Sequence, residues 1–162
     1  MAQTQLFGDH ITLILNSPAA ALAAIEAMDE SDRAQVSPVW LERIRTITDG
    51  DPWCTGFTIV LRDTTTSVGM CAFKGPPNES GEVEIAYGIE DAYRCRGFAT
   101  EAAGLLTRFA LTDPRVRIVC AHTLPEVNAS GTVLTRCGFV RNGDVIDPED
   151  GLVWLWEFPR RA

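Results

Sequence analysis

A short basic segment in the middle of the chain has the residue types of an anion-binding turn. Residues 94–100 read RCRGFAT and lead directly into a helical pattern. Unpaired N–H groups and the partial positive charge at a helix N-terminus attract phosphate. Gly97 lets the backbone approach a ligand oxygen closely, and Ala99 keeps the next contact small. Neither a GxxxxGKS/T nor a GxGxxG motif is present, so the segment predicts either a different kind of phosphate turn or a plain turn with solvated arginines.

Length and composition are typical of one folded domain. The 162 residues are 46% hydrophobic and 22% charged, which suffices for one hydrophobic core and excludes a mainly disordered chain. We therefore expect residues 1–162 to form a single domain. With 14 basic against 22 acidic residues, the net charge is −8. The overall field repels polyanions, so we expect no nucleic-acid partner.

The cysteines and the N-terminal region indicate a cytoplasmic protein. The five cysteines are odd in number and at least 17 residues apart, so they form no CxxC pair and we expect no metal site. Reduced thiols fit a cytosolic chain best. No basic region precedes the first apolar residues, and no apolar run is long enough to span a bilayer. We therefore expect no membrane association.

Hydrophobic periodicity predicts a mixed α/β fold. Residues 82–89 alternate apolar side chains with small or acidic ones, which predicts a strand with Glu84 on one face. Residues 99–111 have helical spacing, with Glu101 and Thr107 on the outside. The expected strands are 6–15, 55–61, 67–73, 82–89, 116–122, 139–146 and 151–158, and the expected helices are 18–28, 38–48, 99–111 and 128–136.

Three segments follow one another in an order that characterises one family of enzymes. Residues 82–89 read EVEIAYGI, residues 94–102 read RCRGFATEA, and residues 128–139 read NASGTVLTRCGF. The second segment is similar to a pyrophosphate motif, Q/R-x-x-G-x-G/A, continued by ATEA. In these segments the chain resembles the GNAT acetyltransferase superfamily, and within it the Rim-type (ribosomal-protein alanine N-acetyltransferase-like) branch.

The resemblance implies a fold and a co-substrate. The fold would have a mostly antiparallel sheet of six or seven strands, flanked by about four helices. The sheet would splay apart between two parallel central strands, one ending at Ile89 and the other at His122. Acetyl-CoA would enter that gap, with its pyrophosphate on the amides of the basic turn and its pantetheine arm on Ile89 and Asn128. The implied cofactor-binding residues are Ile89, Arg94, Arg96, Gly97, Phe98, Ala99, Thr100 and Asn128.

The implied reaction, acetyl transfer to a primary amine, calls for proton transfer. An alkylamine with a pKa of about 10.4 is only about 0.04% neutral at pH 7, so we expect Glu84 to act as a general base through water, with Glu82 as a weaker substitute. An ion-paired strand glutamate fits the same pattern. Ser130 stands where some Rim-type relatives protonate the CoA sulfur, or it caps its own helix. His122 is either a base, part of the amine pocket, or a structural histidine.

Two departures from the family pattern affect these expectations. Many relatives have glycine at the position of Cys95, where a side chain is costly if φ is positive. The family's tyrosine acid after the third segment has no counterpart, which leaves a catalytically inactive CoA-binding sensor as an alternative function.

The amine acceptor would be a small molecule or a peptide N-terminus. An apolar stripe through Trp154 and Trp156 belongs either to the core or to a substrate or homodimer surface.

Overall fold

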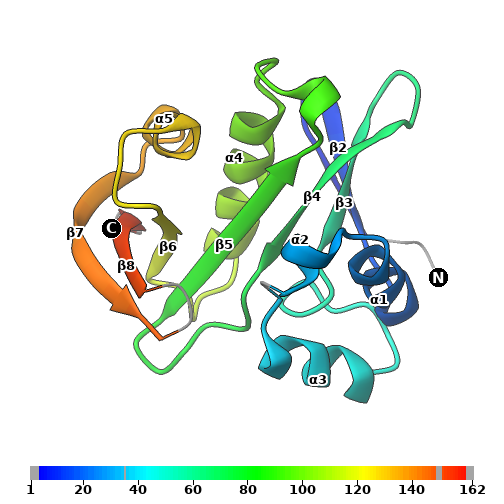
Figure 1. Cartoon of the computed structure of the whole chain (residues 1–162), viewed down its shortest axis with the longest axis horizontal. Helices are drawn as coiled ribbons and strands as arrows, with labels where there is room; N and C mark the ends of the chain where they lie inside the picture. The colour runs from blue at the N-terminus through cyan, green and yellow to red at the C-terminus, as the bar shows by residue number, and fades with distance from the viewer. Residues whose placement is uncertain (1–3, 35, 149–150, 160–162) are drawn as a thin grey trace.

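A computed structural model describes residues 4–34, 36–148 and 151–159 of the chain (Figure 1). Its strands and helices follow in an order that starts with a hairpin and three helices and ends with a long hairpin. The strands are β1 (Gln5–Phe7), β2 (Ile11–Leu15), β3 (Phe57–Leu61), β4 (Ser67–Phe73), β5 (Glu82–Ile89), β6 (Ile118–Thr123), β7 (Val140–Asp147) and β8 (Gly151–Pro159), and the helices are α1 (Pro18–Glu26), α2 (Glu30–Ala34), α3 (Pro38–Thr46), α4 (Phe98–Leu111) and α5 (Ala129–Arg136).

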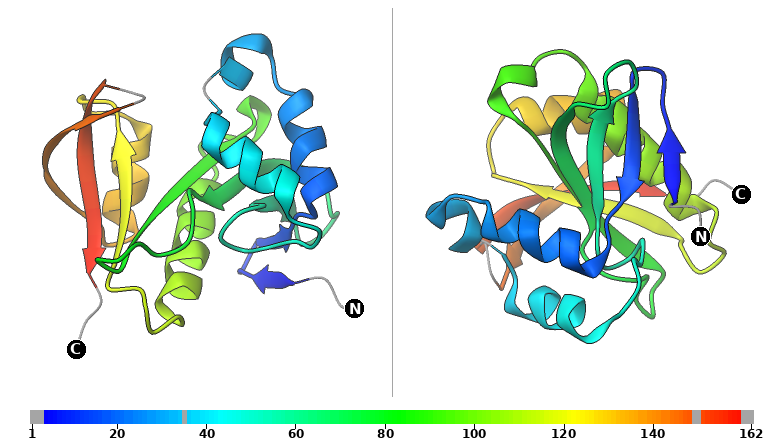
Figure 2. Two further views of the ribbon diagram at one scale, coloured as in Figure 1. Left: turned by 90° about the horizontal axis from the view of Figure 1, so that it is seen from below. Right: turned by 90° about the vertical axis from the view of Figure 1, so that its right-hand side faces the viewer.

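The strands form one sheet in the order β1-β2-β3-β4-β5-β6-β8-β7. Neighbouring strands are antiparallel except for β5 and β6, which run parallel. Those two strands pair only where Glu82–Glu84 lie beside Ile118–Cys120, and beyond that short ladder they separate (Figure 2). The sheet therefore consists of a half ending at β5 and a half beginning at β6, joined at one end of these two strands.

The main core lies between the sheet and α4. Its apolar side chains come from alternate positions of the central strands, such as Val83 and Ile85, and from the inner face of α4, such as Ala102 and Leu106. A smaller core joins α1 to α3 around Ile25 and other buried residues. The two cores leave the opposite face of β5, which carries Glu84, outside the main apolar layer.

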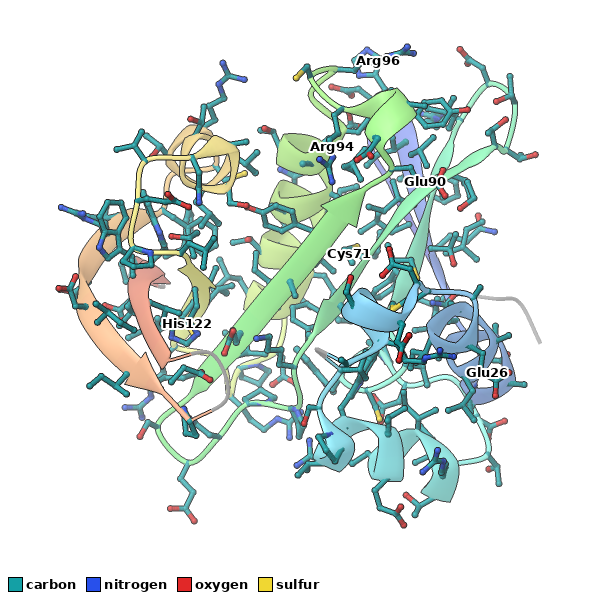
Figure 3. All side chains as sticks on the ribbon, viewed as in Figure 1. Glu26, Cys71, Glu90, Arg94, Arg96 and His122 are labelled. Atoms are coloured by element: carbon teal, nitrogen blue, oxygen red, sulfur yellow. The ribbon has the colours of Figure 1, made fainter. Side chains whose placement is uncertain are left out.

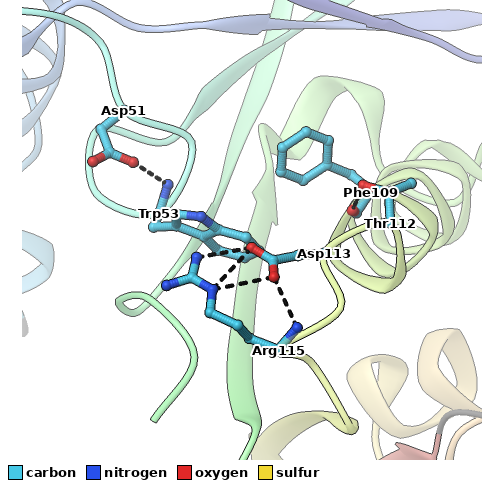
Figure 4. A network of polar contacts seen from close by, with 6 residues as sticks. All are labelled: Asp51, Trp53, Phe109, Thr112, Asp113 and Arg115. Atoms are coloured by element: carbon cyan, nitrogen blue, oxygen red, sulfur yellow. Dashed lines mark hydrogen bonds and ion pairs between the residues drawn. The ribbon is translucent and has the colours of Figure 1, made fainter.

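Local signals in the sequence explain where several elements begin. The side chain of Ser17 accepts a hydrogen bond from the N–H of Ala20 at 3.1 Å, and Pro18 occupies the first turn of α1. After α4, the chain turns through Asp113, whose carboxylate pairs with the Arg115 guanidinium at 2.8 Å (Figure 4). This turn directs the chain back toward β6 along the sheet.

The predicted mixed α/β architecture is confirmed, including the parallel pair of central strands and the gap between them. The sheet has eight strands rather than six or seven because residues 6–15, predicted as one strand, form the two antiparallel strands β1 and β2. Gly8 turns the chain there, and its N–H donates to the carbonyl of Ile11 at 2.9 Å. The five-residue helix α2 was not predicted, because it is too short to show periodicity.

The expectation that Glu101 and Thr107 lie on the outside of α4 is wrong. Thr107 is buried, and its hydroxyl donates to the carbonyl of Ala103 at 2.8 Å. The Glu101 carboxylate is covered by the turn between β1 and β2. In each case a hydrogen bond satisfies a polar group that the helical pattern alone assigns to solvent.

Candidate functional site

The basic segment at residues 94–100 is a left-handed turn that opens α4. Gly97 is the N-cap residue of the helix, with φ of 85°. Cys95 also has a positive φ, of 63°, although its side chain makes that conformation costly, by roughly 1–2 kcal/mol. The condition under which a side chain at this position is costly, a positive φ, is therefore met.

The turn exposes a row of main-chain donors. For the N–H groups of residues 96–100, the described part of the chain shows no protein acceptor, whereas the N–H of Glu101 bonds to the carbonyl of Gly97 at 3.1 Å. A Cβ built on Gly97 would meet no atom within 4 Å, so the space above the turn is open. Free amides, open space and the positive end of a 14-residue helix are the features of a phosphate site.

The two arginines of the turn take different positions beyond the end of β5 (Figure 3). The Arg94 Nε donates to the carbonyl of Ile89 at 3.1 Å, and its Nη2 pairs with Asp91 at 3.1 Å. The Arg96 guanidinium lies 5.6 Å from the centre of the Tyr93 ring. Both side chains are exposed, so Arg94 braces the strand end while Arg96 leaves its charge beside the open amides.

The second half of β5 has a free main-chain edge. The N–H of Lys74 donates to the carbonyl of Glu84, and the N–H of Glu90 donates to the carbonyl of Val68. In this antiparallel ladder the even-numbered residues therefore bond to β4, and the odd-numbered residues direct their main-chain groups to the other side. The main-chain groups of Tyr87 and the N–H of Ile89 thus face the space that β6 has left and can pair with the amide groups of an extended ligand, whereas the Ile89 carbonyl accepts from Arg94.

A cavity of about 120 Å³ lies where the two strands separate. It brings together the predicted Glu84 and Ser130, from β5 and α5, with His122 from β6. Its other polar lining side chains are Lys74 and Tyr87. A carboxylate, an imidazole, an amine and two hydroxyl groups thus share one small space.

Glu84 is paired with two cationic side chains. Its Oε2 lies 2.9 Å from the Lys74 Nζ and 3.0 Å from the His122 Nδ1. Burial raises the pKa of Glu84, but the contacts with His122 and Lys74 together outweigh burial and leave the pKa below its ordinary value. The ion-paired alternative for this residue is therefore present in the structure, and Glu84 is ionised at neutral pH.

His122 both lines the cavity and contacts the carboxylate. The close contact with Glu84 raises the pKa of His122, although burial acts in the opposite direction. The contact uses Nδ1, at an angle outside that of a hydrogen bond. The second ring nitrogen, Nε2, is the one that remains for the cavity.

The start of α5 supplies the opposite wall. The Asn128 side chain accepts a hydrogen bond from the N–H of Gly131 at 3.0 Å and is the N-cap, so Ser130 is not the capping residue. The Tyr87 hydroxyl donates to the carbonyl of Ser130 at 3.3 Å across the gap. Burial raises the pKa of Tyr87 to about 12, so this phenol stays protonated at neutral pH.

Sequence reasoning missed three residues that shape the site. Lys74 follows β4 and reaches Glu84 only because of the antiparallel register of β4 and β5. Tyr87 is one of the apolar positions in the alternation over residues 82–89, although its hydroxyl bonds to Ser130 of α5. Glu101 follows the phosphate turn, and its Oε1 accepts hydrogen bonds from the N–H groups of His10 at 2.7 Å and Ile11 at 3.1 Å. The ATEA continuation was the one signal that could have drawn attention to Glu101.

The described residues contain neither a metal-ligand cluster nor a membrane-spanning helix. Among them, no group of three or more histidine, cysteine, aspartate or glutamate side chains is arranged to hold a metal ion. None of the helices in residues 4–34, 36–148 and 151–159 is both long and apolar enough to cross a membrane.

Comparison with known proteins identifies the family. The profile of the family described as "Acetyltransferase (GNAT) domain" matches residues 12–140. The chain is 32% identical over 84 residues to an uncharacterized N-acetyltransferase, YjdG, of Bacillus subtilis (strain 168), and the match covers 52% of this chain and 50% of that protein. The chain spans about half the length of the curated relatives it matches.

Solved structures share the fold at low identity. A GNAT-family acetyltransferase from Bacillus anthracis superimposes with a TM-score of 0.72 at 16% identity, covering 96% of this chain and 98% of that one. The ribosomal-protein acetyltransferase RimL, solved in complex with coenzyme A, gives a TM-score of 0.70 at 13% identity, with coverage of 96% and 98%. The fold, the splayed parallel strands and the match over residues 12–140 agree, and the chain belongs to the GNAT acetyltransferase family.

Proposed function

We propose that the chain transfers an acetyl group from acetyl-CoA to a primary amine, directly and within a ternary complex. The observation that carries this proposal is the continuous path from the open amides at the start of α4, along the free edge of β5, to a cavity holding Glu84 and Ser130. The acceptor is a small molecule or a peptide N-terminus. The RimL neighbour and the third sequence segment favour the Rim-type branch.

The path matches the parts of acetyl-CoA in order. The N–H groups of residues 96–100 hold the pyrophosphate, with Phe98 in the first turn of α4 and Arg96 adding charge beside it. The edge at Ile89 and Tyr87 pairs with the pantetheine amides, and Asn128 contacts the arm from α5. The thioester then reaches the cavity, because β5 leads from the turn to Glu84.

Glu84 and His122 together handle the proton of the incoming amine. A carboxylate that is already ionised accepts a hydrogen bond from an ammonium group and holds it in place. The raised pKa of His122 makes its ring a stronger base than an ordinary histidine. We propose Glu84 as the general base, acting through water, with His122 as its partner.

The departing thiolate and the carbonyl oxygen need donors. The Ser130 hydroxyl is the proposed proton donor to sulfur, because it lines the cavity and leaves the capping of α5 to Asn128. The N–H of Tyr87 is on the edge of β5 that faces away from β4, and Tyr87 lines the cavity. Its N–H is therefore the proposed donor to the developing oxyanion.

Glu84→Gln is the variant that tests this mechanism. Removing the carboxylate charge should lower turnover by about 100-fold, a typical contribution of general-base catalysis. The measurement is release of free CoA thiol from acetyl-CoA with a panel of amines. Glu82, expected from the sequence as a weaker substitute base, is exposed on the same face of β5 and does not line the cavity, so Glu82→Gln is the matched control and should stay near wild type. Unchanged turnover in Glu84→Gln removes Glu84 from the mechanism.

A CoA-binding module without catalysis is the second candidate function. It is favoured by one observation: the candidate base is held between Lys74 and His122, with its pKa lowered rather than raised. Tight binding of acetyl-CoA by calorimetry, with no thiol release for any amine in the panel, would select this function over acetyl transfer.

A further inference from the structure

One amine already lies in the proposed reaction cavity. Lys74 is the only lysine in the sequence, against 13 arginines, and its side chain lines the cavity. Its Nζ lies 2.9 Å from the Oε2 of Glu84, the proposed base. The cavity therefore contains an amine, a carboxylate in contact with it, and the Ser130 hydroxyl.

The main chain fixes the place of this lysine. Its N–H donates to the carbonyl of Glu84 at 2.9 Å, which extends the ladder between β4 and β5. The two side chains consequently leave neighbouring strands at paired positions and meet on one face of the sheet. The Lys74 side chain is 45% exposed and that of Glu84 is 19% exposed, so the amine is held at the cavity and is partly accessible to solvent.

We infer that Lys74 is a self-acetylation site: the chain transfers an acetyl group from bound acetyl-CoA to its own single lysine. This inference rests on the proposed acetyl-transfer function. An ion pair that presents an amine to the base is the arrangement an external amine substrate would need. An external acceptor must therefore displace Lys74 from Glu84, and in its absence Lys74 is the nearest acceptor.

The reaction balances with acetyl-CoA as the only co-reactant. The Lys74 ammonium gives one proton to Glu84, from which it passes to solvent, and the neutral amine attacks the thioester carbonyl. The C–N bond forms and the C–S bond breaks. The leaving CoA sulfur takes a second proton, which originates from the amine, so the products are N-acetyl-lysine, CoA thiol and one proton in solvent. The product lysine has no charge, so the Lys74–Glu84 ion pair is lost.

Intact-protein mass spectrometry tests the inference. The purified chain is incubated with acetyl-CoA and no other amine, and the expected result is a gain of about 42 Da, one acetyl group in place of one hydrogen. Peptide mapping should place it on Lys74 rather than on the N-terminal amine. Free CoA should slow the reaction by competition, and the rate per molecule should not depend on protein concentration. The Lys74→Arg variant should show no gain at this position.

Three results would overturn the inference. Lys74 of the chain unfolded in guanidinium could gain acetyl as fast as in the folded chain, which would show uncatalysed chemistry. The rate could rise in proportion to protein concentration, which would show transfer between molecules. External amines could be acetylated while Lys74 stays unmodified, which leaves the proposed function intact. If neither Lys74 nor any external amine is acetylated, the proposed function fails as well.

A second measurement does not depend on turnover. A small acetylating ester that reacts with any exposed amine should label Lys74 of the folded chain, and saturating CoA should slow that labelling because the thiol end of the ligand reaches the same cavity. The N-terminal amine is the internal control, and its labelling should not change. Equal labelling of Lys74 with and without CoA would place the thiol end elsewhere and remove the inference.

Discussion

The Glu84 and His122 side chains form a contact whose contribution to stability depends on pH. The pKa of His122 is raised above 6.5, so its contribution to the free energy of unfolding is fully present below pH 6.5 and is lost as pH rises through the folded-state pKa. The pKa of Glu84 is lowered below 4.5, so its contribution to the free energy of unfolding is fully present above pH 4.5 and is lost as pH falls through the folded-state pKa. The contact therefore stabilises the chain most between 4.5 and 6.5.

The measurement is thermal unfolding of the wild type and His122→Gln across pH. The difference in Tm between the two proteins should be largest near pH 5.5 and should shrink toward about pH 9. Glu84→Gln in the same background removes the partner, so the pH dependence of the difference should disappear. A difference in Tm that stays constant from pH 5.5 to pH 9 would contradict the contact.

Cys95 and Gly97 both have a positive φ, which is strained for a residue with a Cβ and unstrained for glycine. Replacing cysteine by glycine and glycine by alanine should therefore change stability in opposite directions. Cys95→Gly should raise the free energy of unfolding by about 0.5–1 kcal/mol, because relief of strain exceeds the added entropy of the unfolded chain. Gly97→Ala should lower it by about 1–2 kcal/mol through backbone strain alone, since the space around a Cβ is open. Urea denaturation of both variants checks the pair, and equal signs would refute the argument.

Sequence reasoning was most reliable where a residue's role depends on its neighbours in the chain. The starts of α4 and α5 were each predicted to within one residue, because the pattern that marks a helix start involves residues only a few positions apart. Glu101 was misassigned to solvent because its partners, His10 and Ile11, lie about 90 positions earlier in the chain. No local pattern contains such a contact.

The turn between β1 and β2 is attached to the first turn of α4 by Glu101. Its carboxylate accepts the N–H groups of His10 and Ile11, and the His10 ring lies 3.2 Å from the other oxygen. Glu101→Ala leaves these donors without their partner and should lower the free energy of unfolding by about 1–3 kcal/mol. Glu42→Ala, at an exposed position of α3, should change it by less than about 0.5 kcal/mol.

The predicted extents of strands and helices depended on how regular their patterns are. Residues 82–89 alternate without interruption, and β5 has those bounds. The strand predicted over residues 6–15 fails because the apolar pattern continues on both sides of Gly8, where the chain reverses. The parting of β5 from β6 follows from the family resemblance and not from any residue pattern, because main-chain pairing has no side-chain signature at Tyr87 or Ile89.

Across the whole molecule, the free edge of β5 should be visible in amide hydrogen exchange. The amides of Tyr87 and Ile89 should exchange faster than those of Ala86 and Gly88, which bond to β4. Saturating CoA should slow exchange at Tyr87 and Ile89, and also at residues 98–100, because the ligand supplies the missing acceptors. Residue-resolved NMR makes the comparison, and CoA that protects only the β4-facing amides would exclude this binding path.

The short ladder between Glu82–Glu84 and Ile118–Cys120 also has a mechanical consequence. Because it lies at one end of two diverging strands, any rotation of one half-sheet against the other would be centred on it. Five further residues of β5, at about 3.3 Å each, extend roughly 16 Å beyond the ladder. A rotation of about 5° about the ladder would then move the far end of β5 by roughly 1.5 Å, and the cavity beside Glu84 would barely change. We therefore expect a bulky group to be better tolerated at the far end of β5 than beside Glu84.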